Sequence, residues 1–184
     1  MGDSDAIIRH LAAQRSLSDP SRCDTARQVC NLGLRITFEE RFHQILEWEL
    51  FVHPEGRREI RAMIGAQTPP LIGQLVFAQM TRHFSSQLRA RGIGRLAPAQ
   101  IADEGRRLLD ALALRLANGG GWLEPDGPGL TDFAVWGQVA PMLCWPMRTP
   151  VADYAKSIPD LGIWHQGLLP GPRGRPSVPA TAMG

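Results

Sequence analysis

The chain has 184 residues, of which 43% are apolar and 21% charged, values typical of one globular domain with a substantial core. Its net charge is +2, and Arg173 and Arg175 near the C-terminus account for both units, which argues against a dedicated nucleic-acid surface. No apolar run approaches the roughly 18 residues of a membrane span, and the acidic N-terminus lacks a signal-peptide pattern. We therefore expect a cytoplasmic protein.

The first 20 residues are predicted to form a short helix and a linker. Asp3 or Ser4 can cap this helix, and the linker contains Pro20. The apolar face of the helix would consist of Ile7, Ile8 and Leu11.

Residues 21–169 form the predicted main domain, because apolar residues recur there at helical spacing and no segment alternates long enough for a strand. One helical pattern places Leu71, Leu75, Ala78 and Arg82 on a single line. The tail over residues 170–184 is rich in proline and is expected to be disordered. The predicted helices cover residues 21–51 (one helix, or two joined near Gly33), 57–63, 71–91, 98–117, 130–139, 153–156 and 157–165.

The stretch from Gly127 to Val139 is the predicted centre of the domain. Gly129 can act as the N-cap of an apolar helix that ends before Pro141. Asp132 then occupies the third helical position, where its carboxylate can accept hydrogen bonds from unpaired N–H groups of the first turn. We expect Gly129 and Asp132 to form the structural cap of the core helix.

The three cysteines fit neither a disulfide nor a zinc site. Cys23 and Cys30 are seven positions apart, too far for a strain-free disulfide, and Cys144 does not complete a zinc-binding spacing with them. We expect buried, reduced thiols.

These segments together resemble the all-helical C-terminal domain of the glutathione S-transferase superfamily, in its metaxin-like and failed-axon-connections-like branch. In that superfamily an acidic residue at the third position of the core helix is a folding determinant, and Asp132 matches it. Gly129 departs from the usual serine or threonine cap of the core helix, and Ala97 stands where this branch often has a serine cap, which predicts weaker capping at both positions. The matching residues are Arg91–Arg95, Gly127–Gln138, Ile158–Leu161 and Trp164.

The resemblance covers residues 3–169 and implies a fold more strongly than an activity. Complete family members begin with a thioredoxin-like domain, and the first predicted helix resembles only the last helix of that domain. The resemblance makes Asp3 and Ser4 candidate glutathione-binding residues, with ordinary helix capping as the alternative. The residue that activates the glutathione thiol has no counterpart, so no catalytic residue is identified. Glutathione is expected only if another chain supplies the missing domain.

Trp48, Phe51 and His53 are candidate substrate-pocket residues, because they lie where transferases of this kind line their apolar substrate site. Core packing is the alternative for these aromatic side chains. The five histidines occur without an HExxH motif, a Cys–His pair or a carboxylate cluster, so we expect no metal site.

Three functions are compatible with these features. The first is a non-catalytic helical protein that acts by dimerisation or by binding a partner or a small apolar ligand. The second is a glutathione transferase-type enzyme whose thioredoxin-like half is truncated or supplied by another chain. The third is an enzyme that uses the Trp48–His53 pocket for other chemistry. We expect a homodimer or a complex with a thioredoxin-like chain, which would cover the apolar N-terminal helix.

Overall fold

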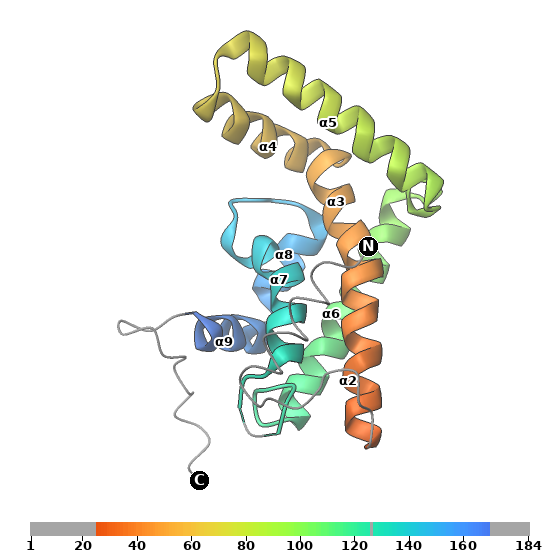
Figure 1. The fold of residues 1–184 in the computed structure, drawn as a ribbon, viewed down its shortest axis with the longest axis vertical. Helices are drawn as coiled ribbons and strands as arrows, with labels where there is room; N and C mark the ends of the chain where they lie inside the picture. Colours follow the sequence, from red (N-terminus) through yellow and green to blue (C-terminus); the bar gives the residue numbers. More distant parts are fainter. Residues whose placement is uncertain (1–24, 126, 170–184) are drawn as a thin grey trace, which may run out of the picture.

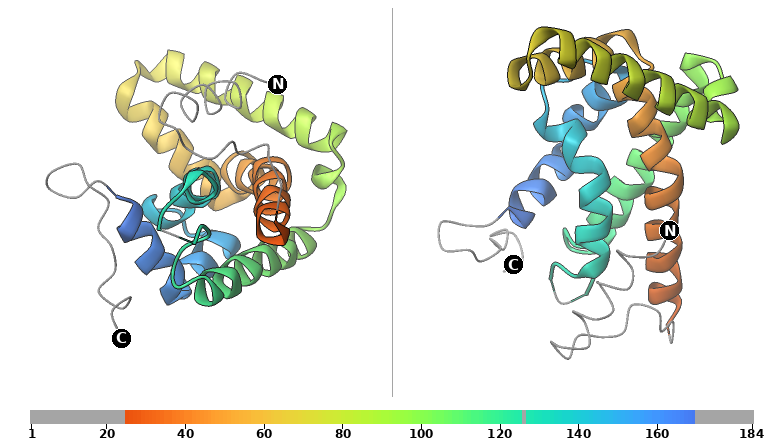
Figure 2. Two further views of the ribbon diagram at one scale, coloured as in Figure 1. Left: turned by 60° about the horizontal axis from the view of Figure 1, so that its bottom comes forward. Right: turned by 45° about the horizontal axis from the view of Figure 1, so that its top comes forward.

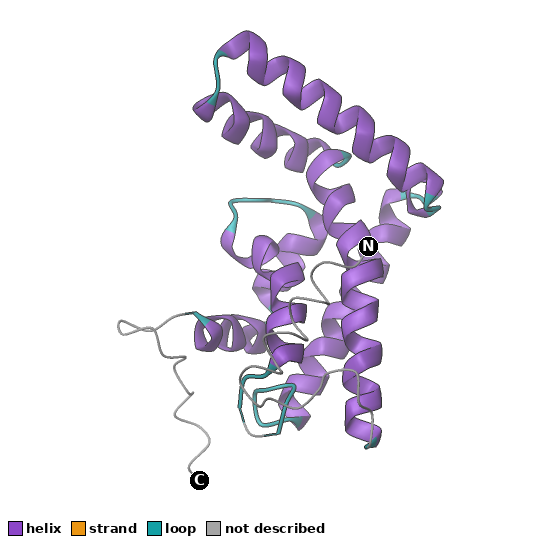
Figure 3. Ribbon diagram, viewed as in Figure 1, coloured by secondary structure: helices purple, strands orange, loops and turns teal. Residues whose placement is uncertain are grey.

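The computed structural model describes residues 25–125 and 127–169, and their regular structure is entirely helical, without a strand (Figures 1 and 3). The all-α prediction is confirmed for this part of the chain. The predicted N-terminal helix, with Asp3 and Ser4, and the tail over 170–184 lie outside the described residues. The elements are α2 (Ala26–Ile36), the π-helical segment η1 (Thr37–Phe42), α3 (His43–Phe51), α4 (Pro54–Gln67), α5 (Pro70–Ala90), the 3-10 turn η2 (Ile93–Arg95), α6 (Pro98–Asn118), α7 (Leu130–Cys144), α8 (Pro150–Ser157) and α9 (Pro159–Leu168).

The first long helix runs through α2, η1 and α3 without a break. Thr25 caps it, since its hydroxyl accepts from the Gln28 N–H while the Gln28 side chain accepts from the Thr25 N–H. Gly33 does not divide the helix. The irregularity is instead the π-helical segment, which begins where the Thr37 hydroxyl donates to the Gly33 carbonyl at 2.8 Å.

Helices α4 and α5 form an antiparallel hairpin beyond one end of the bundle (Figures 1 and 2). The predicted helix over 57–63 is too short, because α4 begins at Pro54 and continues through Gly65 to Gln67. At its start, the backbone of Gly56 lies against α3, where an added Cβ would be 1.8 Å from the Glu49 carbonyl oxygen. The rings of Phe51 and Phe84 stack with centroids 4.0 Å apart and join α5 to α3.

The remaining helices pack around η1 and α3 and enclose most of the hydrophobic core. Gly105 allows a close approach of α6 to α8, because an added Cβ there would lie 2.8 Å from both methyl groups of Val151. Fully buried side chains from six elements belong to this core: Phe42, Ile45, Leu109, Val139, Val151 and Leu161.

Helix α7 lies at the centre of the bundle, as the sequence predicts, with Val135, Val139 and Met142 fully buried. It is longer than predicted, because it continues through Pro141 to Cys144. It is not buried on all sides, however, since Phe133 is 45% exposed. One face of the core helix therefore reaches the surface.

Candidate functional site

Asp132 joins the start of α7 to the loop before it and to α9. Its carboxylate accepts hydrogen bonds from the backbone N–H groups of Leu123, Glu124 and Gly129, at 2.9, 3.3 and 3.1 Å. The indole N–H of Trp164 donates a fourth bond at 2.9 Å. Burial raises the pKa of Asp132, and these four hydrogen bonds oppose that rise. The arrangement extends the predicted cap and is structural, because all four donors belong to the protein itself.

Glu49 forms a similar helix cap, which the sequence does not predict. Its carboxylate is fully buried and accepts a hydrogen bond from the Thr149 hydroxyl, at the N-cap position of α8. The N–H groups of Val151 and Ala152 lie 3.4 and 3.3 Å from its oxygens. Burial raises the pKa of Glu49 against these hydrogen bonds. A residue of α3 thus caps a helix about 100 positions later in the chain.

The candidate pocket residues lie where α3 meets the hairpin. Trp48 and Phe51 are 6% and 7% exposed and pack in the core, and the rings of Trp48 and His53 form a T-shaped pair with centroids 5.6 Å apart. His53 caps α4, because its Nδ1 accepts from the Glu55 N–H at 3.3 Å. What the structure shows for these residues is packing and capping, and a small-molecule site there stays a prediction.

Cys144 and His165 lie within hydrogen-bonding distance of each other, although the sequence showed no Cys–His pair. The expectation of buried thiols is wrong for Cys30 and Cys144, which are both exposed. The indole N–H of Trp136 donates to His165 Nδ1 at 2.8 Å, so the neutral ring carries its proton on Nε2, 3.3 Å from the Cys144 sulfur. Burial lowers the pKa of His165, which favours this neutral form. The ring presents a donor to the sulfur and cannot act as the base of a Cys–His nucleophile.

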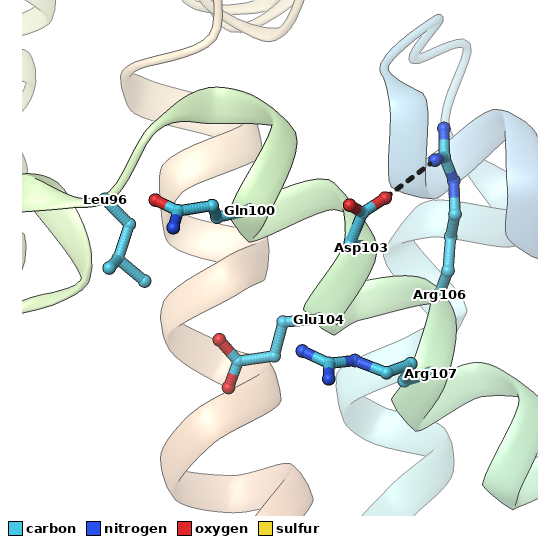
Figure 4. Close-up of a pocket in the computed structure, with 6 residues that line it drawn as sticks. All are labelled: Leu96, Gln100, Asp103, Glu104, Arg106 and Arg107. Atoms are coloured by element: carbon cyan, nitrogen blue, oxygen red, sulfur yellow. Dashed lines mark hydrogen bonds and ion pairs between the residues drawn. The ribbon is translucent and has the colours of Figure 1, made fainter.

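An open hollow of about 620 Å³ lies along α6 (Figure 4). Its carboxylates are paired with arginines, since Glu104 receives two bonds from Arg41, at 2.5 and 2.6 Å, and Asp103 lies 3.1 Å from Arg106. The hydrogen bonds from Arg41 lower the pKa of Glu104. This charge compensation makes the hollow a weak candidate for catalysis or ion binding. It is lined by Leu96, Gln100, Asp103, Glu104, Arg106 and Arg107.

The strongest candidate for a functional surface is the outer face of α5 near the hairpin turn. Leu71 and Leu75 are 83% and 70% exposed, and Ile72 and Val76 beside them are 55% and 39% exposed. The line through Leu71, Leu75 and Ala78 thus faces solvent, while Gly73, Phe77 and Leu88 form the buried side of α5. We call the four exposed residues Leu71, Ile72, Leu75 and Val76 the apolar stripe.

Two kinds of feature are not found within the described ranges, residues 25–125 and 127–169. None of their helices has the length and apolarity to cross a bilayer, and no group of three or more potential metal ligands gathers in them. Comparisons with family models, with curated proteins and with solved structures find no match to the chain. The resemblance to the transferase superfamily therefore rests on the residues quoted above.

Proposed function

We propose that the chain is a non-catalytic helical protein of the glutathione S-transferase C-terminal type, which acts by attaching to another surface through the apolar stripe. The observation that carries the proposal is the exposure of four large aliphatic side chains on adjoining turns of one helix. Their exposed area is on the order of 500 Å², near the upper end of what monomeric proteins leave uncovered. Covering it would favour association before the entropic costs of binding are subtracted.

Two contacts within the bundle support the resemblance on which the family part of the proposal rests. Asp132 and Trp164, which both belong to the residues that resemble the superfamily, are directly hydrogen-bonded. Asp132 also bonds the N–H of Gly129 at the start of α7. A folding determinant at this position would be expected to make such contacts.

The binding surface differs from the one expected from sequence. That expectation relied on Ile7, Ile8 and Leu11, which lie outside the described residues. The apolar stripe offers an attachment surface that does not depend on them. A second copy of the chain and a thioredoxin-like chain remain possible partners under this proposal.

The proposal is tested with a double variant, Leu71→Gln/Leu75→Gln, and a matched control, Leu114→Gln. Leu114 is 65% exposed on α6, so the control makes the same chemical change at similar exposure. Self-association is measured by light scattering over a range of concentrations, and surface attachment by co-sedimentation with vesicles. We expect the wild type and the control to associate in at least one assay, and the double variant to lose that association.

Equal behaviour of all three proteins in both assays would overturn the proposal. Glutathione conjugation is measured in parallel, with the chain alone and with a separately supplied thioredoxin-like domain. Turnover that depends on this chain would instead establish the enzyme alternative.

A further inference from the structure

We propose that the surface bound by the apolar stripe is an anionic lipid bilayer. Resting on the proposed function, this inference identifies its partner. The uncharged tip of the hairpin, residues 62–81, would enter the interfacial region of the bilayer, and the arginines behind it would contact lipid phosphates. The inference rests on the distribution of charge along both helices of the hairpin.

The exposed face of α5 changes character along its length. Its first turns present the apolar stripe and Ala78, and its later turns present Arg82, His83 and Arg89. The helix therefore carries an apolar surface at the hairpin turn and a basic surface towards its base. A helix bound flat against a protein groove more often keeps its apolar face along its whole length.

Helix α4 shows the same gradient in the opposite chain direction. Arg57, Arg58 and Arg61 are exposed near its base, whereas Ala62 and Met63 are exposed on the turn side. Because the two helices are antiparallel, their uncharged ends meet at the turn (Figure 1). Twenty consecutive residues, 62–81, contain no acidic or basic side chain, and Arg61 and Arg82 border them directly.

The net charge of the hairpin favours an anionic partner over a second copy. Residues 54–95 contain seven arginines and two glutamates, a formal charge of +5, while the whole chain carries +2 and the remainder therefore −3. A symmetric contact between two hairpins would place their two positively charged regions against each other, and this repulsion costs free energy. A bilayer with acidic headgroups offers the complementary charge, and its acyl boundary offers a place for the leucines.

The arginines at the base of the hairpin differ in whether they already form ion pairs within the protein. Arg58 pairs with Glu55 at 2.5 Å, and Arg91 lies 3.4 Å from Glu47. Within the described ranges, no carboxylate lies in ion-pair distance of Arg61, Arg82 or Arg89. Their guanidinium groups can form paired hydrogen bonds with phosphate oxygens.

The inference is tested by co-sedimentation of the full chain with phosphatidylcholine vesicles that either contain or lack phosphatidylserine. We expect binding that requires phosphatidylserine and weakens as salt is added. Leu71→Gln/Leu75→Gln should lower the partition coefficient on the order of a hundredfold, because two aliphatic side chains no longer insert. Arg82→Gln/Arg89→Gln should lower it about 25-fold, since each arginine near such a surface contributes about fivefold.

Two matched controls keep the result specific. Leu114→Gln repeats the leucine change on α6, and Arg27→Gln removes an exposed arginine at the start of α2, at the end of the molecule opposite the hairpin (Figure 1). Both should bind as the wild type does. Circular dichroism of each variant shows whether it has kept its helical fold.

The outcomes separate the two proposals. Absence of vesicle binding, or equal binding to both kinds of vesicle, would overturn the lipid inference. If the wild type instead self-associates through the apolar stripe, and Leu71→Gln/Leu75→Gln abolishes this, the lipid inference fails and the proposed function stands. If that variant matches the wild type in both assays, both proposals fail.

Discussion

Helices α5 and α6 have the same length of 21 residues but very different surroundings. Helix α6 buries six residues in the bundle, whereas α5 buries three, and the most exposed leucine among the described residues, Leu71, lies on α5. The hairpin is held by its contacts with α3 and η2 and by the pairing of its own two helices. In the bundle, by contrast, α6 contacts α3, α8 and α9, which are helices distant from it in sequence.

The bundle and the hairpin are stabilised in different ways. The bundle contains two buried carboxylates, Asp132 and Glu49, that accept hydrogen bonds at the starts of α7 and α8. Each fixes the position of one helix relative to another, so the bundle depends on single polar side chains. The exposed side chains of the hairpin do not fix one helix relative to another in this way. They are therefore free to contact a partner. Four predictions test this contrast.

The largest effect on stability is expected for Asp132→Ala. The change leaves four buried or partly buried donors without an acceptor, including the Leu123 N–H and the Trp164 indole. We expect a loss of about 3–5 kcal/mol in the free energy of unfolding, more than for a simple N-cap, because unsatisfied buried donors add to the lost bonds. Chemical denaturation measures the effect. Asp160→Ala, an exposed carboxylate in the first turn of α9, should cost less than about 1 kcal/mol. Equal effects would contradict the proposed role of Asp132.

A smaller loss is expected for Glu49→Gln. The amide can still accept one hydrogen bond at the start of α8, but its NH₂ group replaces an oxygen that faces the donors of Thr149 and Ala152. We expect a loss of about 2–3 kcal/mol in the free energy of unfolding. Glu40→Gln provides the control, because Glu40 is exposed on the same long helix that runs through α2, η1 and α3. A denaturation midpoint unchanged by Glu49→Gln would show that this carboxylate does not support α8.

The buried carboxyl group of Glu49 should make the stability of the bundle depend on pH. Burial raises the pKa of Glu49 in the folded state above its unfolded value, so the folded protein holds this proton more tightly. The contribution is fully present below the unfolded pKa and is lost as pH rises through the folded pKa. For this one proton, the slope is at most about 1.4 kcal/mol per pH unit. Denaturation of wild type and Glu49→Gln from about pH 4 upward should show a steeper decline for the wild type, whereas parallel curves would contradict the raised pKa.

The sequence predicts those features whose causes are local. The Asp132 cap follows from a position three residues after Gly129, and the helices follow from apolar spacing that each segment carries within itself. Glu49 could not be assigned in this way, because its partner Thr149 lies 100 positions away. Cys144 and His165 are 21 positions apart and meet only because α9 packs beside the end of α7.

The apolar stripe illustrates another limit. The spacing of Leu71 and Leu75 shows that they share a helix face, but not whether another element covers that face. In α5 the inward side contains Gly73 and Phe77, so the leucines point outward. Within the first turns of the helix nothing distinguishes the two sides, since both are apolar there. Only the placement of α3 and α4 decides which side becomes the core.

The smallest effect on stability is expected for Leu71→Gln/Leu75→Gln, the variant that should have the largest effect on binding. Both side chains are mostly in solvent, at 83% and 70% exposure, so replacing them removes few contacts from the folded state. Glutamine is also a good helix former, which leaves the helical propensity of α5 nearly unchanged. We expect the free energy of unfolding to change by less than about 0.5 kcal/mol. Phe77→Ala, on the buried side of the same helix, should cost about 3 kcal/mol or more. If the double variant is as unstable as Phe77→Ala, the leucines hold the hairpin in place and are not a binding surface.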